Sequence, residues 1–132
     1  MIKKIIFLLL LSTLPFASFA QDFKEVSQSL VKAKSEKDGN KKFSLIYSAY
    51  QNAGSILVKN YKKSDLERLV KSLPMAFKVH DQYEILENLT GLYQSKKKDF
   101  DALVKEHLSK EDQKKFHKHM KIAIDVATNG NG

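Results

Sequence analysis

The sequence predicts an all-α protein, a small antiparallel helical bundle of five to six helices. Apolar residues recur at spacings of three and four along most of the chain, which is the period of amphipathic helices. No segment alternates apolar and polar residues over the length of a strand. Turn-forming residues, such as Gly39 and Pro74, divide the helical pattern into segments of ordinary helix length.

The first twenty residues have the three parts of a secretory signal peptide. Two lysines precede an unbroken apolar run over Ile5–Leu11, and small residues stand one and three positions before a cut after Ala20. The apolar segment is too short for a spanning helix, which needs about 20 mostly apolar residues, and Pro15 interrupts it. We therefore expect residues 1–20 to be removed by cleavage between Ala20 and Gln21. The mature chain is then expected to be periplasmic or secreted, soluble, and without a transmembrane segment.

The composition of the mature chain excludes several classes of function. Removal of the signal peptide leaves 21 basic and 15 acidic residues, a net charge of +6, and Arg68 is the only arginine. Bidentate recognition of phosphate or guanine favours arginine, so we expect no nucleic-acid partner. The chain contains no cysteine, which excludes disulfides, cysteine nucleophiles and cysteine-ligated metals or clusters.

The first two predicted helices are separated by a turn. The first covers about residues 22–37, and Asp38-Gly39-Asn40 ends it. The second covers about residues 41–60. Its small group Ala53-Gly54-Ser55 allows a close crossing with another helix, or else weakens the helix, because glycine costs about 1 kcal/mol relative to alanine. The apolar stripes are Phe23, Val26, Leu30 and Ala33 in the first helix and Phe43, Ile46, Tyr47, Tyr50, Ala53, Gly54 and Leu57 in the second.

Two helices are predicted in the middle of the domain. Ser64 and Glu67 have the spacing of a capping box, in which each side chain bonds a backbone amide of the first helical turn. A short helix should follow and end or bend at Pro74, because proline lacks the amide proton that the helix needs. The next helix is predicted over about residues 79–94, with an apolar face broad enough for burial on two sides.

The C-terminal part of the domain holds two further predicted helices. One spans about residues 97–108, and the other spans about residues 110–127 with Ser109 as its N-cap. Residues 128–132 contain only Thr, Asn and Gly and are predicted to form a flexible tail. A single helical domain is therefore predicted over residues 21–127.

A weak repeat relates the two halves of this domain. The pattern Asp65-Leu66-x-x-Leu69-Val70-Lys71 recurs 34 residues later as Asp99-Phe100-x-x-Leu103-Val104-Lys105. Two stacked helical hairpins plus a closing helix would explain the repeat. A generic antiparallel bundle explains it as well, because such bundles have similar apolar spacings throughout. No family signature accompanies the repeat.

The histidines are the candidate metal ligands. His80 and Glu84 are four residues apart, which places both side chains on one face of a helix. Zinc needs a third or fourth ligand, and His107 on another predicted helix is the best placed. His117 and His119 point about 200° apart on one helix, so they do not share a metal. The alternative to a metal site is that His80 makes a hydrogen bond at the helix surface and His107 lies at the edge of the core. We expect this alternative, and therefore no metal or other cofactor.

Motifs for catalysis are missing from the sequence. No nucleophile elbow of the form G-x-S-x-G and no glycine-rich phosphate loop occurs. No pair of carboxylates has apolar flanks that would raise a pKa. We therefore expect that the protein is not an enzyme.

Two lysine-rich connections between helices are the candidate binding surface. Tyr61 does not follow an apolar stripe, and lysines flank it on both sides. The equivalent later connection is a run of three lysines, so the two connections together could form one basic face. The alternative is two ordinary solvated turns. The candidate binding residues are Lys59, Tyr61, Lys62, Lys63, Lys96, Lys97 and Lys98.

These observations favour an exported, non-enzymatic interaction module. We expect it to bind a protein partner in the envelope or outside the cell, as an adaptor, an inhibitor or an immunity-type protein does. One alternative is a carrier of a small ligand or metal with a pocket between helices. Another is an electrostatic binder of anionic lipid or polysaccharide.

Overall fold

The computed structural model describes residues 22–130, and the regular structure in this range is entirely helical. The predicted all-α bundle is therefore confirmed. The predicted signal peptide, residues 1–20, and the cleavage site between Ala20 and Gln21 lie outside the described residues. No helix among the described residues is long and apolar enough to cross a membrane.

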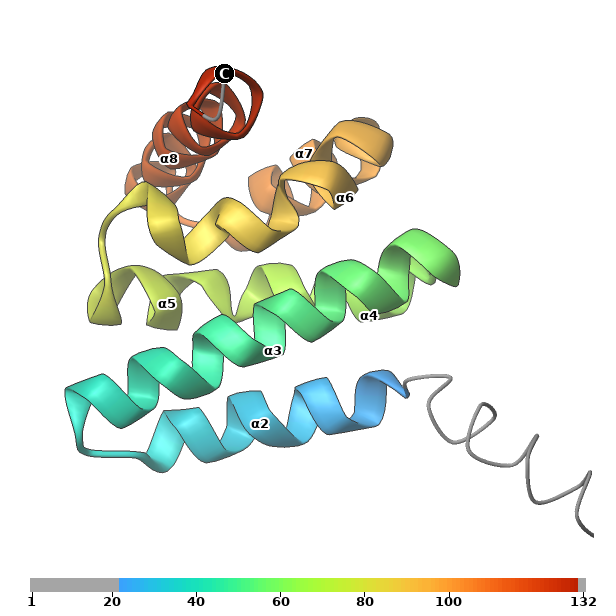
Figure 1. Cartoon of the computed structure of the whole chain (residues 1–132). Coiled ribbons are helices and arrows are strands. Elements are labelled where there is room, and N and C mark those ends of the chain that lie inside the picture. Colours follow the sequence, from blue (N-terminus) through green and yellow to red (C-terminus); the bar gives the residue numbers. More distant parts are fainter. Residues whose placement is uncertain (1–21, 131–132) are drawn as a thin grey trace, which may run out of the picture.

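The helices stack largely in chain order (Figure 1). Helix α2 packs on α3, α3 packs on η1 and α6, and η1 packs on α8, while α4 packs on α7. Helix α3 also contacts α4, α6 contacts α7, and α8 contacts η1, α5, α6 and α7. The stacked hairpins that the weak repeat indicated stay a prediction. The bounds are α2 (Phe23–Ser35), α3 (Gly39–Lys59), α4 (Lys63–Lys71), α5 (Leu73–Val79), the 3₁₀ helix η1 (Tyr83–Leu89), α6 (Thr90–Ser95), α7 (Lys97–His107) and α8 (Lys110–Asn129).

One continuous core runs through the stack, because the apolar stripe of each helix faces a neighbouring helix. Between α6, α7 and α8 the core is aromatic: the ring centroids of Tyr93, Phe100 and Phe116 lie 5.2–5.5 Å apart. Such aromatic pairs add about 0.5–1.5 kcal/mol each beyond the burial of their area. Helices α6, α7 and α8 are therefore joined by the same cluster.

The predicted helix over residues 79–94 is wrong as a single helix. Helix α5 ends at Val79, His80 and Gln82 have extended backbones, and the 3₁₀ helix η1 leads into α6. A 3₁₀ helix has three residues per turn, and η1 buries Ile85, Leu86 and Leu89 between α3 and α8. Contacts on two sides therefore override the local helical pattern.

The predicted break at Pro74 is confirmed. Helix α4 ends at Lys71, and α5 begins at Leu73 with the proline in its first turn, where no amide proton is needed. Ser72 between them keeps helical backbone angles, so the chain does not turn back between the two helices.

Several predicted helix ends differ from the structure, and one is confirmed. The turn predicted at Asp38-Gly39-Asn40 is shorter than expected, because α3 begins at Gly39 with Asp38 as its N-cap. The capping box at Ser64 is wrong, because α4 already begins at Lys63 and its N-cap, Lys62, makes no side-chain bond. The tail begins later than predicted, because α8 continues to Asn129. Ser109 is the N-cap of α8 as predicted, and its hydroxyl accepts a hydrogen bond from the amide of Asp112.

Candidate functional site

The two predicted lysine-rich connections lie against each other. The Nζ of Lys96 is 4.5 Å from the centroid of the Tyr61 ring, and the Tyr61 hydroxyl donates to Asp99 Oδ2 at 2.6 Å. Tyr61 packs against the core and is half-buried, and its bond to Asp99 joins α7 to the α3–α4 connection. Burial and the Asp99 carboxylate raise the pKa of Tyr61, which keeps its hydroxyl protonated and donating.

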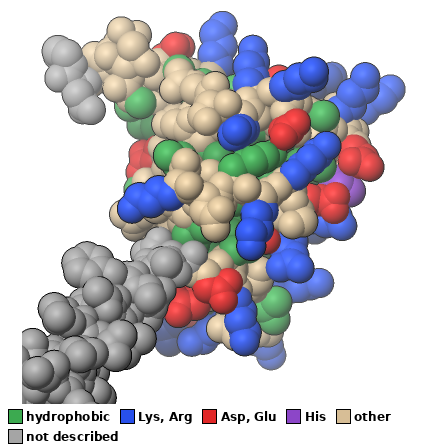
Figure 2. All heavy atoms as spheres, turned by 90° about the vertical axis from the view of Figure 1, so that its right-hand side faces the viewer, with side chains coloured by type: hydrophobic (Ala, Val, Ile, Leu, Met, Phe, Trp, Pro, Cys, Tyr) green, Lys and Arg blue, Asp and Glu red, His purple; other side chains and the backbone are tan. Residues whose placement is uncertain are grey.

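The remaining predicted binding residues are solvent-exposed lysines. Lys59, Lys62 and Lys63 surround the start of α4. Lys97 and Lys98 open α7. Figure 2 shows this end of the molecule, where many Lys and Arg side chains surround smaller areas of apolar surface. The structure therefore brings the two connections together, but it leaves their lysines spread around the end of the molecule.

Two further tyrosines also donate to carboxylates on neighbouring helices. Tyr93 of α6 donates to Asp101 of α7 at 2.7 Å, and Tyr47 of α3 donates to Glu87 of η1. The pKa of Tyr93 is raised by burial and by Asp101, and the pKa of Tyr47 is raised first by its bond to Glu87. These bonds tie helices together at the edge of the core, and Glu87 is therefore engaged with a tyrosine.

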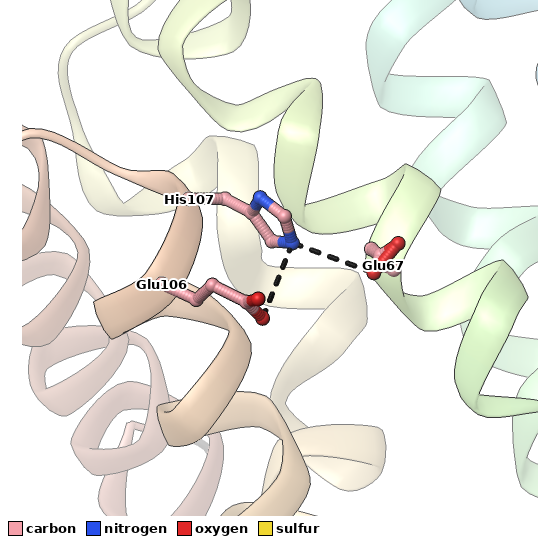
Figure 3. Close-up of side chains that lie close together, drawn as sticks. All are labelled: Glu67, Glu106 and His107. Carbon is pink, nitrogen blue, oxygen red and sulfur yellow. Dashed lines mark ion pairs between the residues drawn. The ribbon is translucent and has the colours of Figure 1, made fainter.

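The predicted metal candidates divide between two places. His80 Nε2 lies 3.1 Å from Glu84 Oε1, although η1 has replaced the continuous helix that predicted the pair. His107 instead lies against two carboxylates, with its Nε2 3.4 Å from Glu67 Oε2 and 3.5 Å from Glu106 Oε2 (Figure 3). The sequence did not predict this second cluster, because Glu67 and His107 are far apart in the chain and meet only where α4 packs on α7.

A buried histidine was also missed. His119 is 5% exposed, and its Nε2 lies 2.7 Å from Asp81 Oδ1. Lys115 approaches the other oxygen of the same carboxylate at 3.5 Å. The bond to His119 and the charge of Lys115 hold the pKa of Asp81 below its usual range. The sequence did contain an indication that His119 is buried. It lies between Phe116 and Met120, which belong to the buried stripe of α8.

A groove runs along α2 on the side that faces α4 and α5. Its first hollow, of about 620 Å³, lies between α2 and the start of α4. A second hollow, of about 400 Å³, continues it to Met75 in α5, and Ser27, Val31 and Arg68 border both. Helix α2 packs chiefly on α3, which leaves Val31 70% exposed on the groove side.

The groove has an apolar floor and a mainly basic rim. Phe23, Leu30, Val31 and Met75 form its apolar part. Its acidic residues, Asp22 and Asp65, are outnumbered by the basic ones. The basic residues are Lys24, Lys32, Lys34, Lys62, Arg68 and Lys71. Sequence reasoning missed the groove, because its walls come from helices whose sides meet only in the folded protein.

Comparison of the chain with protein-family models, with curated proteins and with solved structures found no match.

Proposed function

We propose that the protein is an exported, non-enzymatic binding module that holds an acidic, amphipathic helix of a partner protein. The groove between α2 and α4–α5 would be its binding site. The observation that carries the proposal is the combination of an apolar floor with an excess of positive charge at the rim. A helix bound in such a groove places apolar side chains, spaced by three and four, on the floor.

The charge of the rim favours an acidic partner. Arg68 reaches Asp65 only at 3.9 Å, and Lys71 reaches Glu67 at 3.8 Å. Exposed pairs of this kind are worth about 0–1 kcal/mol, so both cations can be redirected to a partner at little cost. Carboxylates on the partner would speed its association and fix its orientation. A second copy of this chain carries the same positive charge, which disfavours it as the occupant.

Val31→Glu tests the proposal directly. The side chain of Val31 is 70% exposed, so the substitution leaves the core intact while it places a negative charge among the apolar residues that line the groove. Val58→Glu is a matched control, because Val58 is also a helical valine, 60% exposed, and lies outside the groove. Wild-type protein and both variants would be used to capture partners from the native envelope fraction, and the affinity of a purified partner would be measured for each.

We expect a partner with an acidic amphipathic helix whose affinity falls at least tenfold, a loss of about 1.4 kcal/mol, for Val31→Glu and stays unchanged for Val58→Glu. A partner that binds both variants as well as wild type would contradict the proposed site. Capture of lipid or polysaccharide alone, lost as salt rises and reduced equally by any lysine substitution, would favour an electrostatic binder instead.

A further inference from the structure

Three potential metal ligands converge where α4 packs on α7 (Figure 3). They are one oxygen each from Glu67 and Glu106 and the Nε2 of His107, and these atoms lie within 4.8 Å of one another. Buried apolar residues on both helices hold the two backbones in place beneath them. The three side chains therefore meet without any rearrangement of the fold.

The distances suit a shared ion better than a hydrogen bond. Nε2 of His107 lies 3.4 Å from Glu67 Oε2 and 3.5 Å from Glu106 Oε2. Charge-assisted hydrogen bonds are shorter, about 2.7–2.9 Å. Zinc bonds nitrogen at about 2.0–2.1 Å and carboxylate oxygen at about 2.0–2.2 Å, which puts two tetrahedral ligands about 3.4 Å apart. The two nitrogen–oxygen separations match edges of that tetrahedron.

The imidazole nitrogen has no other partner. Nε2 of His107 is shut off from solvent and makes no hydrogen bond among the described residues. A buried polar atom without a partner costs free energy, and a bound cation would supply the missing interaction. The other oxygen of the Glu67 carboxylate lies 3.8 Å from Lys71 Nζ, and Oε2 is the oxygen that faces His107.

We propose that Glu67, Glu106 and His107 form a binding site for a divalent transition-metal ion, with Zn²⁺ as the best fit. One nitrogen and two carboxylate oxygens are ligands that zinc accepts, and water would complete a four-coordinate shell. Calcium requires six to eight oxygen ligands, which is far more than this cluster offers. None of the three ligands lines the groove, although Lys71 on the groove rim pairs with Glu67. Metal binding can be measured without the proposed partner.

Calorimetric titration of the untagged, metal-free mature chain with Zn²⁺ tests the site. We expect one ion per chain near neutral pH. Glu67→Gln and His107→Gln should each weaken binding at least tenfold. His80→Gln is the control, because it removes a histidine that pairs with a different glutamate, Glu84.

Binding that is lost with His80→Gln but kept with Glu67→Gln and His107→Gln would overturn the proposal, and so would the absence of zinc binding by the wild-type chain. Circular dichroism of each metal-free variant would verify that it remains folded. Substitution of Co²⁺ adds a measurement that does not depend on stability. Wild type should show the intense visible absorption of four-coordinate cobalt, and a weak six-coordinate spectrum would count against the proposed geometry.

Discussion

Gly54 determines how closely α3 approaches η1. A Cβ at this position would lie 2.5 Å from the backbone oxygen of Asn88, which is closer than real contacts of this kind. The close crossing that the small group in the second predicted helix allowed is therefore present. Because the atom that a Cβ would meet belongs to the backbone, a side chain at this position could be accommodated only if α3 moved relative to η1. We expect Gly54→Ala to lower the free energy of unfolding by roughly 1–3 kcal/mol, measured by urea denaturation.

Gly91 provides the matched control for this substitution. It also lies in a helix, α6, but a Cβ there would meet nothing within 4 Å. Gly91→Ala should be neutral or stabilising by up to about 1 kcal/mol, because alanine is the better helix former. Equal effects of the two substitutions would show that the crossing with η1 tolerates a side chain.

Asp81 makes the stability depend on pH in the acid range. Its folded pKa lies below the usual value of 3.8, mainly because His119 hydrogen-bonds the carboxylate and Lys115 lies near it. The folded protein therefore binds the proton less tightly than the unfolded chain. This stabilisation is complete above pH 3.8 and is lost as the pH falls through the lower folded value.

We expect Asp81→Asn to destabilise the protein near pH 6 and to have a smaller effect near pH 2, measured by urea denaturation at both. The effect should be modest, because the Asp81 side chain is 49% exposed and solvent screens its interactions. Asp125→Asn, at an exposed position on α8, is the control and should change stability little at either pH. A cost for Asp81→Asn that does not vary with pH would contradict this account.

At the scale of elements, a buried hydrogen bond joins α3 to the residue between α4 and α5. The Tyr50 hydroxyl lies 2.6 Å from Ser72 Oγ, and Ser72 donates its own proton to the carbonyl of Leu69 at 2.6 Å. Because Ser72 has a single proton, Tyr50 must be the donor in their bond. Tyr50 is fully buried, so no water can replace this acceptor.

We expect Ser72→Ala to cost roughly 1–3 kcal/mol, because it leaves the buried Tyr50 hydroxyl without a partner. Tyr50→Phe should cost less, about 0.5–1.5 kcal/mol, because Ser72 keeps its bond to Leu69. The double variant should cost less than the sum of the two, since both remove the same bond. Urea denaturation of the three variants measures these values, and additive costs would show that the bond is not formed.

The elements that could be predicted from sequence are those with one buried face. The stripe of α2, for example, repeats with helical spacing from Phe23 to Ala33, and each of its residues is buried. The segment from Val79 to Ser95 could not be predicted, because α3 and α8 cover η1 on different sides. A broad apolar face indicates burial on two sides, but it does not distinguish an α-helix from a 3₁₀ helix followed by a short α-helix.

At the scale of the whole molecule, the candidate sites depend on contacts between distant segments. His80 and Glu84 could be paired from sequence because they are four residues apart. The cluster of Glu67, Glu106 and His107 arises only because α4 packs on α7. Helical period reports which side of a helix is buried, but it does not report which two helices become neighbours.

The stack of helices predicts uneven stability along the chain. Helix α2 lies at one end of the stack and packs chiefly on α3, whereas α3 also contacts η1, α5 and α6. Elements with few neighbours open at lower free energy than the core. We expect the amides of α2 to exchange with deuterium faster than those in the middle of α3, measured by hydrogen-exchange mass spectrometry. Equal protection would mean that α2 unfolds only together with the whole domain.

The terminal position of α2 has a consequence for recognition. Helix α2 is also one wall of the groove, so the width of the groove is set by an element held mainly from one side. A ligand that spans both walls would brace α2 against α4 and suppress its local opening, and part of its binding free energy would be spent on that ordering. The affinity for the ligand would then depend on the stability of the packing between α2 and α3. A substitution on the side of α2 that faces α3 would change the affinity without contacting the ligand.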